Sequence, residues 1–381
     1  MRRLELLSLD FLSMSMRSNV TLFFGIILSL IESLNSNIVQ ISMLVATAPI
    51  IWGMTSLIMP RLMSKYSVYQ IVSAGAWILA VSAALRLTGE IFTLFFFTLT
   101  LNIGIGILNI AIPAWVKQIA PNATEVLLSR HYKIMLLASG CSIIMSVVML
   151  ETGSDWKWAF APWLVISLLG AGLLTFVPNE LITRSSKIIE TTSNSSGNRT
   201  GLIIFILFFG IQGISSQAFG AWAPTLIIDY GFTTLTSAIV CAILATMGAF
   251  LASKLLSQQL SQAKLQMYLK VASVLLVLGF LQLFSEQLPI FSLGLLLIFC
   301  SQSIIFLISL ISIARWSNDV NQVLRVSLTV QGFGYVIAGF GPICVGLIRQ
   351  SQGSWEACIF FMIICTLAQF VFGRKTLKVS H

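Results

Sequence analysis

The stretch from Ile290 to Ala314 reads IFSLGLLLIFCSQSIIFLISLISIA and contains 25 residues without a charged side chain. A helix of about 20 apolar residues is long enough to cross the hydrocarbon core of a bilayer. A transmembrane barrel has shorter segments, of about ten residues, in which polar and apolar side chains alternate. The continuous apolar run therefore predicts a membrane-spanning helix.

Similar runs recur along the whole chain and predict an all-α integral membrane protein with about twelve transmembrane helices. Only 9% of the 381 residues are charged, against about 25% in soluble domains, which excludes a soluble enzyme of this length. The other predicted segments are Leu4–Leu30, Ile38–Met59, Tyr69–Leu87, Ile91–Val116, Tyr132–Leu150, Trp158–Val177, Leu202–Ile228, Leu235–Leu256, Met267–Phe284, Val326–Leu347 and Ala357–Phe372.

A polar stretch, Pro178–Gly201, separates the sixth segment from the seventh and has the Ser, Thr, Asn and Gly content of a flexible linker. It divides the predicted helices into six and six, as two pseudo-symmetric bundles require. The predicted organisation is an N-terminal six-helix bundle (1–177), a cytoplasmic linker loop (178–201) and a C-terminal six-helix bundle (202–381).

The charges indicate an orientation. With both termini in the cytoplasm, most of the 22 Lys and Arg residues fall in inner loops, and the outer loops hold Arg86, Lys157 and Arg349. Scattered single charges of this kind do not suit nucleic-acid binding, so we expect no nucleic-acid partner. Because the first apolar run continues well past the length of a signal peptide, we expect a retained first helix.

Arg17 lies about halfway along the first predicted segment. A guanidinium in mid-bilayer is costly and normally faces a polar cavity and a partner. No Asp or Glu lies near the middle of the other predicted segments. The partner is then an anionic substrate held by the fork of guanidinium donors. The alternative is that Arg17 pairs with Asp10, seven residues earlier, or extends to the interface, and is only structural.

Neutral polar side chains interrupt the fourth, seventh, tenth and eleventh segments, at Asn102, Asn109, Gln212, Gln302 and Gln331. Amides in hydrocarbon need hydrogen-bond partners, so they face either protein or a water-filled path. Any single one suits helix packing as well as ligand contact, but polar residues from the first, fourth, seventh and tenth segments together favour a shared cavity. The candidate substrate-binding residues are Arg17, Asn109, Gln212, Trp222, Gln331 and Tyr335.

Glycine and proline mark two segments. Small residues allow helices to approach closely, and proline weakens a helix so that it can bend. This pattern suits helices that move against their neighbours, and equally suits static tight packing. The residues expected to serve conformation or packing are Gly104, Gly106 and Pro113 in the fourth segment, and Gly334, Gly341 and Pro342 in the eleventh.

Catalytic constellations are missing from the sequence. The two histidines, His131 in a predicted loop and His381 at the end, form no HExxH pair, and neither a GxSxG elbow nor a GxxxxGK[ST] loop occurs. The six cysteines lie in apolar runs and are interpreted as packing residues. We therefore expect no enzyme activity, no cofactor and no metal.

The six-plus-six plan, the loop from Pro60 to Lys65 and the pair Gly341-Pro342 resemble the major facilitator superfamily. The stretches Gly104–Lys117, Gly210–Pro224 and Gln331–Tyr335 are similar to its cyanate/2-nitroimidazole transporter branch. That resemblance implies two six-helix bundles, alternating access and a bacterial inner membrane. Arg17 falls where the branch has an arginine, but its usual Asn-x-Arg-Pro is Ser15-Met-Arg-Ser18 here, which leaves the substrate open.

The sequence predicts a secondary transporter of a small anionic or polar organic solute, and we expect a monomer whose partners are that solute and the lipid bilayer. The alternatives are a multidrug-type efflux carrier and a non-transporting membrane sensor. Proton coupling usually uses a carboxylate in the path, and Asp10 is the one candidate near it. Proton symport, uniport and exchange all stay open, as does the direction of transport.

Overall fold

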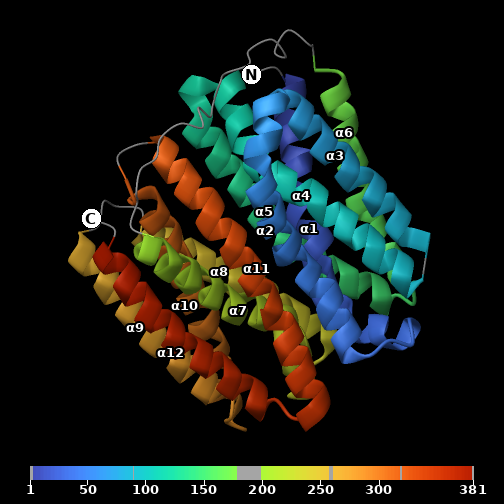
Figure 1. Ribbon diagram of the computed structural model, residues 1–381. Coiled ribbons are helices and arrows are strands. Elements are labelled where there is room, and N and C mark those ends of the chain that lie inside the picture. Colours follow the sequence, from blue (N-terminus) through green and yellow to red (C-terminus); the bar gives the residue numbers. More distant parts are fainter. Residues whose placement is uncertain (1–2, 89, 178–198, 257–260, 318–319, 380–381) are drawn as a thin grey trace. The chain divides into compact units, whose positions relative to one another are not determined.

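The computed structural model describes residues 3–88, 90–177, 199–256, 261–317 and 320–379 (Figure 1). Twelve of the described helices are long and apolar enough to cross a membrane, which confirms the predicted fold class. Most of the predicted linker, residues 178–198, lies outside the described residues. The helices are α1 (Arg3–Ser33), α2 (Ile38–Lys65), α3 (Val68–Leu85), α4 (Ile91–Ile119), α5 (Thr124–Glu151), α6 (Ala161–Thr175), α7 (Arg199–Asp229), α8 (Thr234–Leu255), α9 (Gln262–Gln282), α10 (Leu288–Ala314), α11 (Val320–Gln352) and α12 (Glu356–Val379), with the short 3₁₀ helices η1 (Arg86–Thr88), η2 (Pro121–Ala123) and η3 (Trp156–Phe160).

Two helices begin with a clear local signal. At the start of α2, the Asn37 side chain accepts from the Gln40 backbone while the Gln40 side chain accepts from the Asn37 backbone. Ser67 and Gln70 form the same reciprocal pair at the start of α3. Each pair satisfies backbone donors that a helix start leaves unpaired. Short turns can therefore separate long helices without exposing bare amides.

The chain divides into two compact units, one of Met1–Thr191 with Ile227–Ala242 and one of Thr192–Leu226 with Ile243–His381. In the first unit α1 packs along α5 and α6, and α4 packs against α2 and α3. Ser8 on α1 donates to the Gly170 carbonyl on α6 over 2.9 Å. Polar contacts between small residues are typical of helix packing in membranes. The predicted boundaries at residues 177 and 202 stay a prediction.

In the second unit α9 packs against α10 and α12. Glycine sets the distance between α7 and α11: a Cβ at Gly334 would lie 2.6 Å from the Phe209 ring, and one at Gly341 would overlap the Ile214 carbonyl. Both glycines were predicted to serve packing or conformation, and here each lies against a neighbouring helix. Pro342 lies inside α11, next to Gly341.

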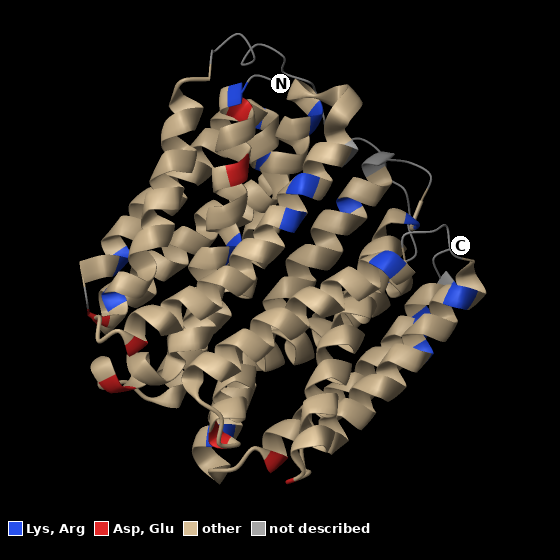
Figure 2. Cartoon of the chain, turned by 180° about the vertical axis from the view of Figure 1, so that it is seen from behind, with Lys and Arg blue, Asp and Glu red and all other residues tan. Residues whose placement is uncertain are grey.

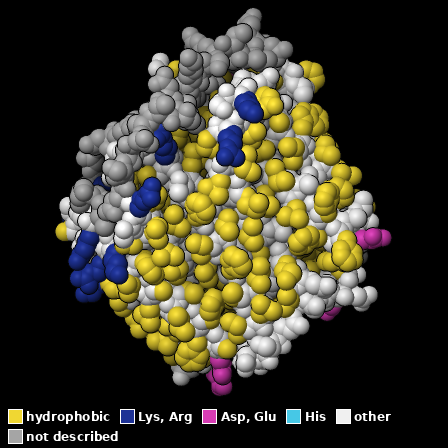
Figure 3. Space-filling model, viewed as in Figure 1, with side chains coloured by type: hydrophobic (Ala, Val, Ile, Leu, Met, Phe, Trp, Pro, Cys, Tyr) yellow, Lys and Arg dark blue, Asp and Glu magenta, His cyan; other side chains and the backbone are white. Residues whose placement is uncertain are grey.

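The outer surface suits hydrocarbon. Large apolar side chains are widely exposed, among them Phe92 at 83% and Phe250 at 71%. In the face shown in Figure 3, hydrophobic side chains cover the middle and charged ones lie toward the margins. Figure 2 shows Lys, Arg, Asp and Glu mainly near helix ends. An apolar surface of this extent marks contact with lipid or another apolar phase.

Helix α5 begins at Thr124, well before the predicted start at Tyr132. His131, predicted in a loop, is therefore inside a helix and is 3% exposed, so that prediction is wrong. The apolar run is interrupted by Arg130 and Lys133, but helical hydrogen bonding does not depend on hydropathy. The backbone continues the helix across these charges.

The close packing of α4 on α3 gives a stability test. A Cβ at Gly104 would lie 2.7 Å from the Gly75 carbonyl and 2.8 Å from the Leu79 amide, and backbone cannot rotate away. We expect Gly104→Ala to destabilise the protein by about 1–3 kcal/mol. Gly172→Ala is the matched control, because nothing lies within 4 Å of its Cβ position. Apparent unfolding temperatures in detergent measure both, and equal effects would contradict the packing described here.

Candidate functional site

Arg17 lies on α1 with its side chain partly exposed. Its guanidinium carbon is 5.1 Å from the centroid of the Trp52 ring on α2, a cation–π contact. The Tyr132 phenol on α5 lies within electrostatic range of the same charge. A cation–π contact is not a hydrogen bond, so it leaves the N–H groups of the guanidinium for a ligand. Within the described residues, this guanidinium has neither a carboxylate nor a hydrogen-bond partner.

Asp10 has a different partner. Its carboxylate accepts two hydrogen bonds from Arg130 on α5, from Nε over 2.9 Å and from Nη2 over 2.6 Å. The Asp10 side chain is 12% exposed and that of Arg130 is 50% exposed. This is the bidentate geometry of a strong ion pair. The structure therefore pairs Asp10 with Arg130 and not with Arg17.

Arg86 corrects a sequence prediction. It was placed in an outer loop, but it is fully buried at the start of η1. Its Nη1 donates to the Asn19 carbonyl over 3.1 Å and its Nη2 to the Asn19 Oδ1 over 2.5 Å. The guanidinium also lies 4.7 Å from the Phe160 ring centroid and 5.6 Å from that of Phe23. The available signal was that Arg86 falls inside the third apolar run, near its end.

Asn19 connects three helices through its amide. Besides accepting from Arg86, it donates from Nδ2 to the Ser15 carbonyl over 2.9 Å and to Ser167 Oγ on α6 over 3.1 Å. Its neighbour Arg17 is two residues earlier on α1. The amide therefore holds the middle of α1 against α6 and η1, next to the candidate substrate-binding arginine.

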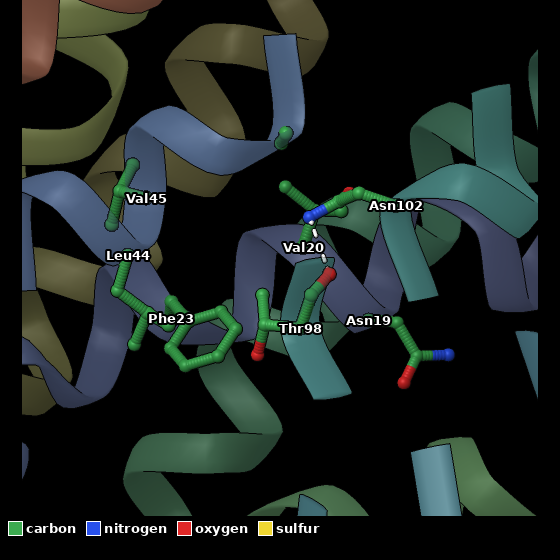
Figure 4. Close-up of a pocket in the computed structure, with 8 residues that line it drawn as sticks. Asn19, Val20, Phe23, Leu44, Val45, Thr98 and Asn102 are labelled. Atoms are coloured by element: carbon green, nitrogen blue, oxygen red, sulfur yellow. Dashed lines mark hydrogen bonds between the residues drawn. The ribbon is translucent and has the colours of Figure 1, made fainter. Parts of the chain in front are cut away.

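A small pocket lies beside Asn19, between α1, α2 and α4 (Figure 4). Asn102 donates from Nδ2 to Thr47 Oγ1 over 3.1 Å and to the Thr98 carbonyl over 3.0 Å, while its Oδ1 has no partner in the described part of the chain. The pocket has about the volume of a single water molecule, so an organic solute does not fit. Its lining residues are Asn19, Val20, Phe23, Leu44, Val45, Ala48, Thr98 and Asn102.

Asn109 lies on the same helix as Asn102 but in another environment. Asn102 is 1% exposed, whereas the Asn109 side chain is exposed. Near it on α4, Gly106 lies directly against the Thr55 side chain of α2, and Pro113 lies within the helix. Gly104 and Gly106 thus serve close packing of α4, and Asn109 keeps an exposed amide.

The candidates of the second unit lie on α7 and α11. Gln212 is 2% exposed, and its Nε2 has no partner among the described residues. Gln331 donates to Ser327 Oγ over 2.7 Å, and Tyr335 meets Phe209 edge-on with ring centroids 5.2 Å apart.

Trp222, predicted as part of an aromatic wall, is 3% exposed. It donates from Nε1 to the Pro342 carbonyl over 3.3 Å and packs on Trp355. Trp222 therefore joins α7 to α11, and its indole N–H already has a hydrogen-bond acceptor in the Pro342 carbonyl.

The structure thus brings Arg17, Trp52 and Tyr132 together on three helices of one unit. Reasoning from sequence missed Trp52 and Tyr132, because aromatic residues in apolar runs are usually packing residues.

The Major Facilitator Superfamily model matches residues 9–306 of this chain. The chain belongs to this superfamily. Its relatives are transporters, in agreement with the expectation that the protein is not an enzyme. An uncharacterized transporter of Bacillus subtilis (strain 168), YycB, is 24% identical over 373 residues, which cover 96% of this chain and 91% of that protein.

A 2-nitroimidazole transporter of Escherichia coli (strain K12) is 20% identical over 319 residues, covering 81% of this chain and 79% of that protein. Among solved structures, the proton:xylose symporter XylE is similar with a TM-score of 0.75 at 13% identity, covering 99% of this chain and 96% of that one. The nucleoside transporter NupG has a TM-score of 0.74 at 13% identity, covering 100% and 99%. At such identities these structures establish the fold alone. The family match and the twelve apolar helices of the described residues indicate a multi-pass integral membrane protein.

Arg86 and Arg17 are expected to differ in their effect on stability. Arg86→Gln removes the donors that satisfy two Asn19 oxygens, and we expect a cost of about 1–3 kcal/mol. Arg17→Gln removes only a stacking contact from a partly exposed side chain, so we expect little change. Apparent unfolding temperatures of both variants in the same detergent measure the difference. A larger loss with Arg17→Gln would show that Arg17 is the structural arginine.

Proposed function

We propose that this transporter carries a small organic anion and that Arg17 recognises its negative charge. The observation that carries the proposal is a comparison of three arginines in the first unit. Arg130 is paired with Asp10, and Arg86 donates from both Nη atoms to Asn19 and lies against two aromatic rings, with its Nε unpartnered among the described residues. In the described part of the chain, the guanidinium of Arg17 contacts the Trp52 ring and donates no hydrogen bond, so its donors stay available.

The physical argument is charge compensation. A guanidinium within a membrane helix is costly unless an anion or a polar cavity compensates it. An anionic solute supplies that compensation only while it is bound, which is what a carrier needs. Because the cation–π contact with Trp52 is not a hydrogen bond, the fork of N–H donors is left for an anion that accepts two parallel hydrogen bonds, such as a carboxylate.

The neutral contacts we propose are Asn109, Gln212, Gln331 and Tyr335. Asn109 keeps an exposed amide, and Gln212 has an unpartnered amide nitrogen. Trp222 is a weaker candidate, since its N–H is bonded within its own unit. The 20% identical relative is named a 2-nitroimidazole transporter, which supports a small polar solute in general.

We further propose that the halves 1–177 and 202–381 operate by alternating access, as transporters built from two repeats do. The excess of Lys and Arg in the predicted inner loops supports both termini in the cytoplasm and a plasma-membrane location. In this orientation the N-terminal end of α1 is cytoplasmic.

The test is uptake of labelled cyanate, formate and benzoate into proteoliposomes. Arg17→Gln is expected to lower uptake of the carried anion by about tenfold or more, the loss expected for a hydrogen bond to a charged group. Arg17→Lys keeps the charge without the planar fork, so it should raise KM while uptake remains measurable.

Arg61→Gln is the matched control, because Arg61 is an exposed arginine of the same unit. It should transport like the wild type. If folded Arg17→Gln protein takes up the carried anion as fast as wild type, Arg17 is structural and does not recognise the charge of the solute. If the wild type takes up none of the three anions, that result would also count against a carrier of small organic anions.

A further inference from the structure

A line of polar groups runs along one face of α1. Asp10, Ser13 and Arg17 are spaced by three and four residues, so they lie on the same side of the helix. With a rise of 1.5 Å per residue, Ser13 is about 6 Å along the axis from Arg17. Asp10 and Ser13 both contact α5, through Arg130 and His131 respectively.

His131 is held in this line by a hydrogen bond to Ser13. The distance between His131 Nδ1 and Ser13 Oγ is 2.6 Å, and the imidazole is 3% exposed. Ser13 Oγ also lies within hydrogen-bond distance of the Leu9 carbonyl. When the imidazole is protonated, both of its nitrogens carry a proton, so Nδ1–H donates to Ser13 Oγ and the Ser13 hydroxyl donates to the Leu9 carbonyl. Ser13 can therefore accept a hydrogen bond from the charged imidazole and keep a partner for its own proton.

We propose that His131 is the proton-binding residue of this transporter and that its protonation is linked to anion binding at Arg17. The inference rests on the proposed function, since it identifies how transport by that same site is coupled. Asp10, the candidate from sequence, is less suited to this task. Its carboxylate is occupied by the two hydrogen bonds from Arg130.

The link is electrostatic. Arg17 is about one helical turn from Ser13, and its charge reaches the phenol of Tyr132, whose ring lies beside that of His131. We infer that this charge also opposes a second positive charge on His131. An anion bound to Arg17 neutralises that opposition, so proton and anion favour each other's binding. Linkage is reciprocal, and couplings of this kind are typically about 5- to 150-fold. Anion affinity should therefore rise as the pH falls through the protonation range of His131.

The other charged groups around His131 do not replace Arg17 in this role. On α1, Asp10 forms a closed pair with Arg130, and Glu5 lies more than two turns from Ser13. Helix α4 carries one charged residue, the exposed Lys117, and η2 has no ionisable side chain. The first unit also includes residues 227–242, whose charged residue is Asp229 at the end of α7, and η3, whose Lys157 pairs with Asp155. On α5 itself, the Tyr132 ring is tilted by 57° against the imidazole with ring centroids 5.3 Å apart, and Lys133 is exposed.

The decisive experiment observes the proton directly. The chain has two histidines, so His381→Gln leaves His131 as the only signal in ¹⁵N-histidine NMR of the full chain in nanodiscs. In that background Arg17→Gln imitates the neutralisation that an anion would cause. We expect the protonation midpoint of His131 to rise by roughly one pH unit, the shift that a tenfold coupling produces.

Arg17→Lys in the same background keeps the charge and should leave the midpoint unchanged. Arg61→Gln removes an exposed charge on α2 and should also leave the midpoint unchanged. The proposal is overturned if Arg17→Gln does not move the midpoint, or if His131 does not titrate between about pH 4 and 9, the range in which histidine normally titrates.

A flux measurement separates this inference from the proposed function. Proteoliposomes with an internal pH dye report whether cyanate uptake brings protons with it, and we expect His131→Gln to abolish that proton movement while cyanate exchange persists. Unchanged proton movement in His131→Gln would overturn the inference and leave the anion carrier intact. If wild type does not carry cyanate, the proposed substrate class fails there, and the NMR titration still decides whether Arg17 controls His131.

Discussion

The absence of hydrogen-bonding solvent inside a membrane is the constraint on which this structure depends. Every guanidinium placed there needs a partner of its own. Three arginines of the first unit have three different kinds of partner. Arg130 has a carboxylate. Arg86 has one asparagine and two aromatic rings, and Arg17 has a single aromatic ring. The partner of each arginine indicates whether it serves structure or function.

The same constraint explains how the helices are joined. The hydrophobic effect, which drives helices together in water, is weak in lipid. Helix association there depends on close packing and on hydrogen bonds between small polar groups. Glycines bring α4 against α3 and α7 against α11, and Ser8 and Asn19 bond α1 to α6. Each such bond is worth only about 0.6 kcal/mol on average, so rigidity comes from many of them along α1.

The position of Arg17 on α1 bears on the proposed recognition of the solute's charge. That helix packs against both α5 and α6, and the polar groups near Arg17 are fixed by bonds to these helices. Arg17 therefore lies on a helix that is fixed by its neighbours, while its own guanidinium donates no hydrogen bond within the described residues. A binding charge on a rigid element is better placed to sense a neighbouring titratable group than one on a loop.

The sequence by itself determined the number and approximate extent of the helices, because bilayer thickness converts directly into length of apolar run. It also identified Arg17, since one charge in such a run is visible without any structure. The burial of Arg86 and His131 was decided only by tertiary structure. Their partners, Asn19 and Ser13, are 67 and 118 residues away in the chain. The exposure and the partners of a side chain depend on which helices pack together. A hydropathy pattern along the sequence does not specify these neighbours.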